Sequence, residues 1–239
     1  DPCAMAPQHA TEPWHKDLPI VSILLLALIV LGCLLCDVFL TKDSGYMDLR
    51  HCSAAPNREF LFGTDTMGRD IFSMIWSGGR LSLFIGICAT LLSTAIAVFF
   101  GSLSGCAGEK LDAFFMRVNE IFISIPNLLL IVLLQAILGK ASALSLSIVI
   151  GLTSWMSIAK VVRTEVRVLR SSEYVLASRC MGGGFFHVLR QHLAPNFFSS
   201  ISFMVVMNIR SAITAESTLS FLGIGLPIEV VSWGSMLSL

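Results

Sequence analysis

Charged side chains are scarce in this chain. Asp, Glu, Lys and Arg make up 13% of its 239 residues, against roughly 25% in an ordinary soluble domain. The 16 basic residues balance the 16 acidic ones, so the formal net charge is zero, and no overall positive field points to a nucleic-acid partner. Hydrophobic residues reach 55% and the mean hydropathy is +0.80. The composition therefore favours a membrane protein.

The sequence also lacks the short motifs of nucleotide-binding and catalytic sites. No segment has the GxxxxGK[ST] pattern of a phosphate-binding loop, because Gly105, Gly108 and Lys110 have the wrong spacing. No HExxH motif, Ser–His–Asp order or catalytic carboxylate pair stands out, and the five histidines lack metal-ligand spacing. We therefore predict that the chain is not an enzyme and binds no cofactor or metal itself.

The cysteines do not form a recognisable disulfide framework. They number seven, an odd count, and are scattered along the chain. Cys33 and Cys36 have CxxC spacing, but both lie in one apolar segment. We expect them to behave as small hydrophobic residues rather than as a redox or metal site.

Five apolar segments are long enough to cross about 30 Å of hydrocarbon as helices. They are Leu18–Cys36, Leu81–Gly108, Ile121–Gly139, Ala141–Ala159 and Phe197–Phe221. The chain is accordingly divided into a tail at 1–17, a first transmembrane helix at 18–40, a loop at 41–80 and a transmembrane domain at 81–239. This organisation predicts an all-α polytopic membrane protein.

Smaller signals interrupt the transmembrane domain. Residues 109–120 are polar and are expected to form a short turn. Pro126 lies six residues into the third apolar run, where neighbouring helices can absorb a kink. After the fifth run, Gly223–Pro227 and Trp233–Gly234 predict a re-entrant end at the membrane interface.

The longest polar interruption within the transmembrane domain is Lys160–Asn196, which holds six of the sixteen basic residues. Ser172 is expected to cap a short helix that runs through Arg179, and Gly182–Gly184 to end it. Pro195 is expected to open the next membrane helix, where a missing N–H costs little. The pattern predicts a helix–glycine–helix element in the cytoplasm.

The loop before the second apolar run ends in a turn-rich motif. Its members are Gly63, Thr64, Asp65, Gly68, Arg69 and Asp70. Asp70 is expected to cap a short helix through Trp76 that Gly78 and Gly79 end. We interpret the two aspartates as a capped turn with Asp–Arg pairing, in preference to a catalytic or metal-binding pair.

Several motifs resemble the second permease of the bacterial ABC importers for dipeptides, oligopeptides and nickel. The GTDxxGRD run at 63–70 is the most specific, and Phe221–Gly225 followed by Trp233–Leu237 is a second match. The 171–196 loop resembles the EAA loop of these permeases. Ala177, Gly182 and Pro195 match its pattern, whereas the Glu, second Ala, Ile and Leu positions are occupied by Leu176, Ser178, His192 and Ala194.

The resemblance implies a type I ABC importer permease fold, with five spans present of an expected six, the sixth lying beyond Leu239. It also implies that the 171–196 loop docks on an ATPase. The residues expected to carry that coupling are Glu173, Tyr174, Ala177, Ser178, Gly182, His192 and Pro195.

The expected partners follow from the same resemblance. They are a second homologous permease, two ABC ATPase subunits, an extracytoplasmic substrate-binding protein and membrane lipid, with no nucleic acid. ATP and magnesium would be bound by the ATPases. The substrate class remains open between di- or oligopeptides and nickel or a metallophore.

Basic residues favour one orientation in the bacterial inner membrane. With the N-terminus in the cytoplasm, nine lie inside and six outside. This arrangement places the 171–196 loop in the cytoplasm and the 41–80 loop outside.

Two charges fall within the fifth apolar run, Arg210 and Glu216. Charged groups at membrane depth normally face the bundle interior, so each is either anchored by other helices or lines a substrate path. The alternative function is a secondary transporter or channel subunit. Such a protein would be expected to carry coupling-ion carboxylates in broken helices and an internal repeat, neither of which the sequence displays.

Overall fold

The computed structural model describes residues 20–39, 45–170, 172, 178, 180–182, 184, 194–227 and 229–238. Within these residues the fold consists of helices, as predicted, with one isolated bridge between Thr64 and Asp70. The helices are α1 (Ile20–Leu34), α2 (Cys36–Phe39), a 3-10 turn (Leu49–His51), α3 (Ile71–Cys106), α4 (Glu109–Ser124), α5 (Asn127–Leu138), α6 (Ala143–Thr153), α7 (Met156–Leu169), α10 (Ala194–Phe221) and α11 (Trp233–Met236).

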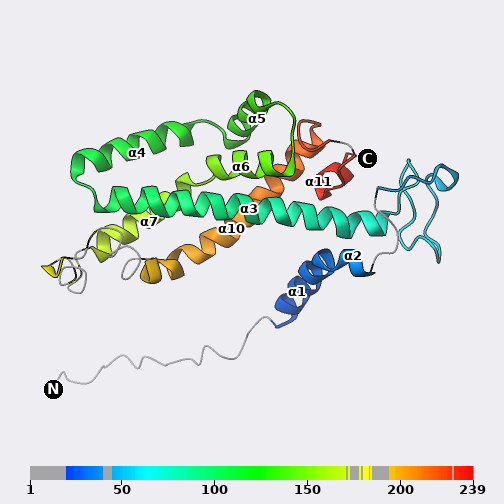
Figure 1. Ribbon diagram of the computed structural model, residues 1–239, viewed down its shortest axis with the longest axis horizontal. Coiled ribbons are helices and arrows are strands. Elements are labelled where there is room, and N and C mark those ends of the chain that lie inside the picture. Colours follow the sequence, from blue (N-terminus) through cyan, green and yellow to red (C-terminus); the bar gives the residue numbers. More distant parts are fainter. Residues whose placement is uncertain are drawn as a thin grey trace, which may run out of the picture.

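Helix α3 is the central helix of the bundle, with α6, α7 and α10 beside it (Figure 1). Its 36 residues span about 54 Å. Asp70 caps its first turn, as predicted, by accepting hydrogen bonds from the backbone N–H groups of Phe72 and Ser73. The prediction that Gly78 and Gly79 end this helix is wrong, because α3 continues through both.

Close packing explains why these two glycines lie within a helix. A Cβ at Gly79 would lie 2.6 Å from the Cys33 sulfur and 2.7 Å from the Trp233 ring, and one at Gly78 would lie 3.1 Å from the Ser232 backbone. The bare surface lets α1 and α11 approach the backbone of α3. The glycines are therefore contact points rather than helix breaks.

The segment after α3 differs from its prediction in two ways. Residues 109–120 form most of the amphipathic helix α4 rather than a short turn. The chain then bends by 88° between α4 and α5, so Pro126 separates two helices instead of kinking one. Proline lacks an N–H and disfavours a helical conformation in the residue before it, and Ile125 is indeed extended, with ψ of 128°.

A second break separates α6 from α7, which meet at 45°. Helix α7 continues to Leu169, beyond Ala159, where the fourth apolar run ends. The side chains of Val162 and Val166 are fully buried against α3 and α10, while the charged residues lie on the opposite stripe. An amphipathic helix of this kind is stabilised because its apolar face packs on other helices, and it does not need an uninterrupted apolar sequence.

Two hydrophobic clusters hold the bundle together. The first joins α3, α7 and α10 through Ala97, Ile158, Ala159, Val162, Val166 and Ile201. The second joins α3, α5, α6 and α10 through residues that include Ile85, Leu146, Ile150 and Leu219. Exposed apolar side chains cover α1, as suits a lipid-facing helix.

By length and composition, α3 is the one helix among the described residues that can cross a membrane alone. The bent pairs α4–α5 and α6–α7 each meet the same standard when taken together. The count of five spans therefore stays a prediction.

The two ends of the bundle carry different segments (Figure 1). The 45–70 loop precedes the N-terminus of α3 and lies beside α11. The C-terminal end of α7 and the N-terminal end of α10, which flank the 171–196 loop, lie at the opposite end of α3.

Candidate functional site

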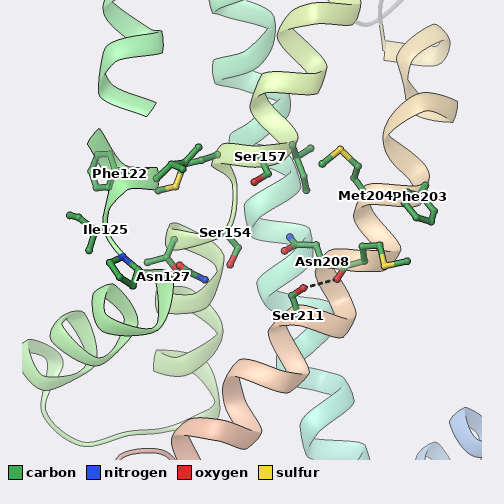
Figure 2. Close-up of a pocket in the computed structure, with 15 residues that line it drawn as sticks. Phe122, Ile125, Asn127, Ser154, Ser157, Phe203, Met204, Asn208 and Ser211 are labelled. Carbon is green, nitrogen blue, oxygen red and sulfur yellow. Dashed lines mark hydrogen bonds between the residues drawn. The ribbon is translucent and has the colours of Figure 1, made fainter. Parts of the chain in front are cut away.

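The two helix breaks face one another across a cavity of about 520 Å³ (Figure 2). One wall comes from the break between α4 and α5, the second from the break between α6 and α7, and the third from α10. The lining residues are Phe122, Ile123, Ile125, Pro126, Asn127, Thr153, Ser154, Met156, Ser157, Ile158, Phe203, Met204, Met207, Asn208 and Ser211.

The chemistry of this cavity is apolar with a few hydrogen-bonding groups. Its polar side chains are amides and hydroxyls, among them Asn127, Ser154 and Asn208 (Figure 2), and none of the described residues that line it is ionisable. Irregular backbone is tolerated at membrane depth where it is buried in protein or borders a water-filled cavity. The arrangement can accommodate a neutral, hydrogen-bonding group.

Two asparagines fix the walls of the cavity. The Asn208 amide donates to the Ser93 hydroxyl over 2.6 Å, which ties α10 to α3. The buried Asn119 amide donates to the Met156 carbonyl over 3.2 Å, which ties α4 to the start of α7. The second contact thus joins the two broken helices to each other, and the first holds the third wall of the cavity on α3.

Glu216 does not line the cavity. Its side chain is fully buried, and its carboxylate accepts hydrogen bonds from the hydroxyls of Ser82 (3.0 Å), Ser220 (2.9 Å) and Ser232 (2.8 Å). These contacts join α3, α10 and the N-cap of α11. Glu216 therefore serves as a junction between three elements.

Arg210 lies on another face of α10 and is exposed. Six residues separate it from Glu216, which turns the two side chains about 120° apart on a helix, and the buried carboxylate is taken up by serines. A charged side chain facing lipid at the bilayer centre costs at least about 2.5–3.5 kcal/mol. Exposed Arg210 therefore calls for water or an anionic group beside it.

The turn-rich motif before α3 is a structural unit. The Asp65 carboxylate accepts hydrogen bonds from the backbone N–H groups of Met67 and Arg69 and from Arg69 Nε at 2.7 Å. Arg69 is only 2% exposed. The Thr64 hydroxyl donates to the His51 carbonyl and accepts from the backbone N–H of Ala54. The interpretation as a capped turn with an Asp–Arg pair is confirmed.

Glycines make the same turn possible. Gly63 and Gly68 both have φ of +76°, and a Cβ at Gly68 would overlap the Asp48 carbonyl. Among the residues described, no cluster of His, Cys, Asp or Glu could hold a metal ion.

The 171–196 loop is described at only a few positions. Glu173, Tyr174, Ala177 and His192 lie outside the described residues. The Ser178 side chain is buried, whereas Cys180 and Met181 are exposed, with Met181 at 83%. Gly182 has φ of +88° with open space where a Cβ would stand, so the predicted turn at this glycine is confirmed.

The two ends of this loop also have described residues. Pro195 lies in the first turn of α10, as predicted. The Ser172 hydroxyl donates to the Leu169 carbonyl and so extends the end of α7. Whether Ser172 also caps a following helix concerns residues outside those described.

An ion pair that the sequence did not reveal lies at the same end of the bundle. Asp112, in the polar stretch that begins α4, bonds through its two carboxylate oxygens to Arg163 Nε and Nη2, both over 2.5 Å. The Ser104 hydroxyl donates to the same carboxylate, and Arg167 lies 3.3 Å away. The Arg163 guanidinium is the main cause that holds the pKa of Asp112 down at about 2, so this carboxylate stays ionised.

No local signal marks Asp112 as important. Arg163 is 51 positions further along the chain, and aspartate in the first turn of a helix ordinarily has only a dipole role. The role of Asp112 becomes visible only when α4 is paired with α7, and that pairing depends on the tertiary fold.

Broken helices that border a cavity in an apolar bundle occur in membrane transport proteins. The chain belongs to the family described as the binding-protein-dependent transport system inner membrane component, whose model matches residues 97–239. It is a transport subunit and not an enzyme, which confirms the resemblance drawn from the sequence motifs.

Named relatives extend this similarity over most of the chain. The oligopeptide transport system permease protein OppC of Bacillus subtilis is 36% identical over 223 residues, which cover 93% of this chain and 73% of that protein. The dipeptide transport system permease protein DppC of the same organism is 37% identical over 181 residues, covering 76% and 56%. OppC of Haemophilus influenzae is 33% identical over 221 residues, covering 92% and 71%.

Proposed function

We propose that this chain is one of two permease subunits of an ATP-driven ABC importer and forms half of its substrate path. The observation that carries the proposal is the cavity at which both helix breaks meet α10, in a chain that belongs to this family. The transported substrate is a di- or oligopeptide, as the names of the relatives suggest. A nickel complex or metallophore is the alternative substrate.

Coupling to ATP takes place at the 171–196 loop. Two ATPase subunits bind ATP and magnesium in the cytoplasm, and the one that grips this loop moves α7 and α10, which flank it, as a rigid body. The ion pair of Asp112 with Arg163 supports this step, because it links α4 to α7 close to the loop. The second permease completes the path on the other side.

An extracytoplasmic binding protein delivers the substrate at the end that carries the 45–70 loop and α11. The N-terminus lies in the cytoplasm. The separation of the 45–70 loop from the α7 and α10 ends along α3 supports their placement on opposite sides of the membrane (Figure 1).

Reconstitution tests the proposal. The chain should co-purify with a different permease and two ATPases, and proteoliposomes with the binding protein outside should take up a labelled dipeptide only when ATP is enclosed. Titration of the binding protein with peptides and with nickel complexes then decides the substrate class. Uptake that persists without the ATPases would indicate a secondary transporter or channel instead.

A pair of glycine variants tests the coupling loop. Gly182→Val forces a β-branched residue into positive φ, which costs about 1 kcal/mol or more, and should lower uptake and substrate-stimulated ATP hydrolysis together. Gly184→Ala is the matched control, because open space surrounds that position and its φ is not positive. Normal coupling in Gly182→Val would show that this loop is an ordinary connector.

A further inference from the structure

The exposed face of α10 changes in character along its length. The part nearer its N-terminus is apolar, with Phe203 and Val206 exposed by 66% and 62%. The turn from 210 to 214 is polar, because Arg210, Ser211 and Thr214 are all exposed, and Phe221 near the end of the helix is again apolar and exposed. At 100° per residue these positions lie within one broad stripe of the helix.

Arg210 occupies a defined depth. Asn208 bonds to Ser93, which lies near the middle of the apolar run 81–108. Arg210 is two residues further along α10, a rise of about 3 Å towards the end that carries α11. Its backbone therefore lies close to the middle of that apolar run.

Arg210 lies one turn beyond residues of α10 that line the cavity, since Met207 is three positions and Phe203 seven positions before it on the same face of the helix. Ser211 lines the cavity (Figure 2) and is adjacent to Arg210 in sequence. Glu216 cannot neutralise the arginine, because its carboxylate is enclosed by Ser82, Ser220 and Ser232 on another face. The hydroxyls of Ser211 and Thr214 donate to carbonyls of α10 itself, so the Arg210 guanidinium is the group on this face that requires water or an anion beside it.

We infer that Arg210 lies in the water-filled path on the α11 side of the cavity and binds the carboxylate of the passing substrate. A guanidinium binds a carboxylate through two parallel hydrogen bonds. Because Arg210 is exposed to water, that contact is weak enough to release the substrate into the cavity. The inference rests on the proposed function, and it adds an anionic group to the substrate class.

Charged thiol reagents test the electrostatic part. The complete transporter, with its native cysteines replaced, carries Thr214→Cys and is treated with an anionic and a cationic methanethiosulfonate. Arg210 should make the anionic reagent react roughly tenfold faster relative to the cationic one than it does after Arg210→Gln. Leu24→Cys on lipid-facing α1, where the leucine is 63% exposed, should react with neither.

Substrate chemistry tests the recognition. Arg210→Gln should lower the uptake of a dipeptide severalfold more than the uptake of its C-terminal amide, and Arg210→Lys should restore part of the difference. Every permease variant uses the same binding protein. The preference of the binding protein for the dipeptide or its amide therefore cancels when each variant is compared with the unmodified transporter.

Two outcomes overturn the inference. An unreactive Thr214→Cys would show that the partner permease covers this stripe, and this measurement leaves Arg210 untouched, so it does not depend on how well an arginine variant folds. Equal loss for the dipeptide and its amide would show that Arg210 does not read the carboxylate. Neither result affects the proposed function, which fails only if the unmodified transporter shows no ATP-dependent uptake.

Discussion

Asp112 and Arg163 form a two-pronged ion pair between α4 and α7, with both N–O distances at 2.5 Å. The aspartate is only 7% exposed and the arginine 19%. The Ser104 hydroxyl brings α3 into the same contact. Three helices are thereby joined at the end of the bundle that carries the proposed coupling loop.

Asp112→Asn should destabilise the assembled protein. Loss of one charge leaves Arg163 partly buried and unpaired, a change that costs about 3 kcal/mol in comparable sites. Thermal unfolding of the purified complex measures the effect. Arg117→Gln is the control, because the Arg117–Glu120 pair is exposed by 81% and 51% and should contribute less than about 1 kcal/mol. Equal thermal stability of both variants would contradict a structural role for Asp112.

Gly105→Val should disrupt the packing of α3 against α7. A Cβ at this position would lie 2.7 Å from Val166 and 3.0 Å from the Arg163 carbonyl, so the helices must separate and lose buried contacts, at about 1–3 kcal/mol. Gly108→Ala, three positions on, is the control, since nothing lies within 4 Å of its Cβ. The comparison uses the yield and thermal stability of the detergent-solubilised protein. A Gly105→Val protein as stable as Gly108→Ala would exclude this close contact.

Glu216→Ala should loosen α11 from α3 and α10. The substitution removes the acceptor of three serine hydroxyls and leaves a buried space, whereas Glu216→Gln keeps the size and one carbonyl acceptor. Loss of a hydrogen bond to a buried charged group costs about 1.5–3 kcal/mol, so the alanine variant should be clearly less stable than the glutamine variant. Limited proteolysis near Trp233 reports on α11. Glu229→Gln, at an exposed position, should behave as the unmodified protein.

Thiol labelling in intact cells should distinguish the two ends of the bundle. Cys52 and Cys180 are both exposed and belong to the 45–70 loop and the 171–196 loop, respectively. A membrane-impermeant maleimide should label Cys52 in intact cells and Cys180 only after permeabilisation. The opposite pattern would reverse the proposed orientation.

Local signals predicted several parts of the fold correctly. Asp70 caps α3, Gly182 takes a positive φ, and Pro195 lies in the first turn of α10. Each depends on the conformational preferences of one or two residues, which act in any context. The apolar runs likewise predicted where helices lie, although not where they bend.

Other parts depended on partners that are distant in sequence. Two consecutive glycines such as Gly78 and Gly79 usually indicate the end of a helix, yet α11 and α1 pack on them and the helix continues. Lys160 begins a polar stretch, yet α7 extends past it, because Val162 and Val166 find a buried surface on α3. A single sequence does not show which helix surfaces will pack against each other.

The sequence alone determined that this chain is a helical membrane protein of a recognisable transport family, because apolar length and short motifs are local properties of the chain. The tertiary structure alone decided that the two breaks open on one cavity, that Glu216 is enclosed by serines while Arg210 is exposed, and that Asp112 meets Arg163. These relationships join residues from different helices. Their geometry is set by how the helices pack, since burial, pairing and exposure are properties of the assembled bundle and of no single segment.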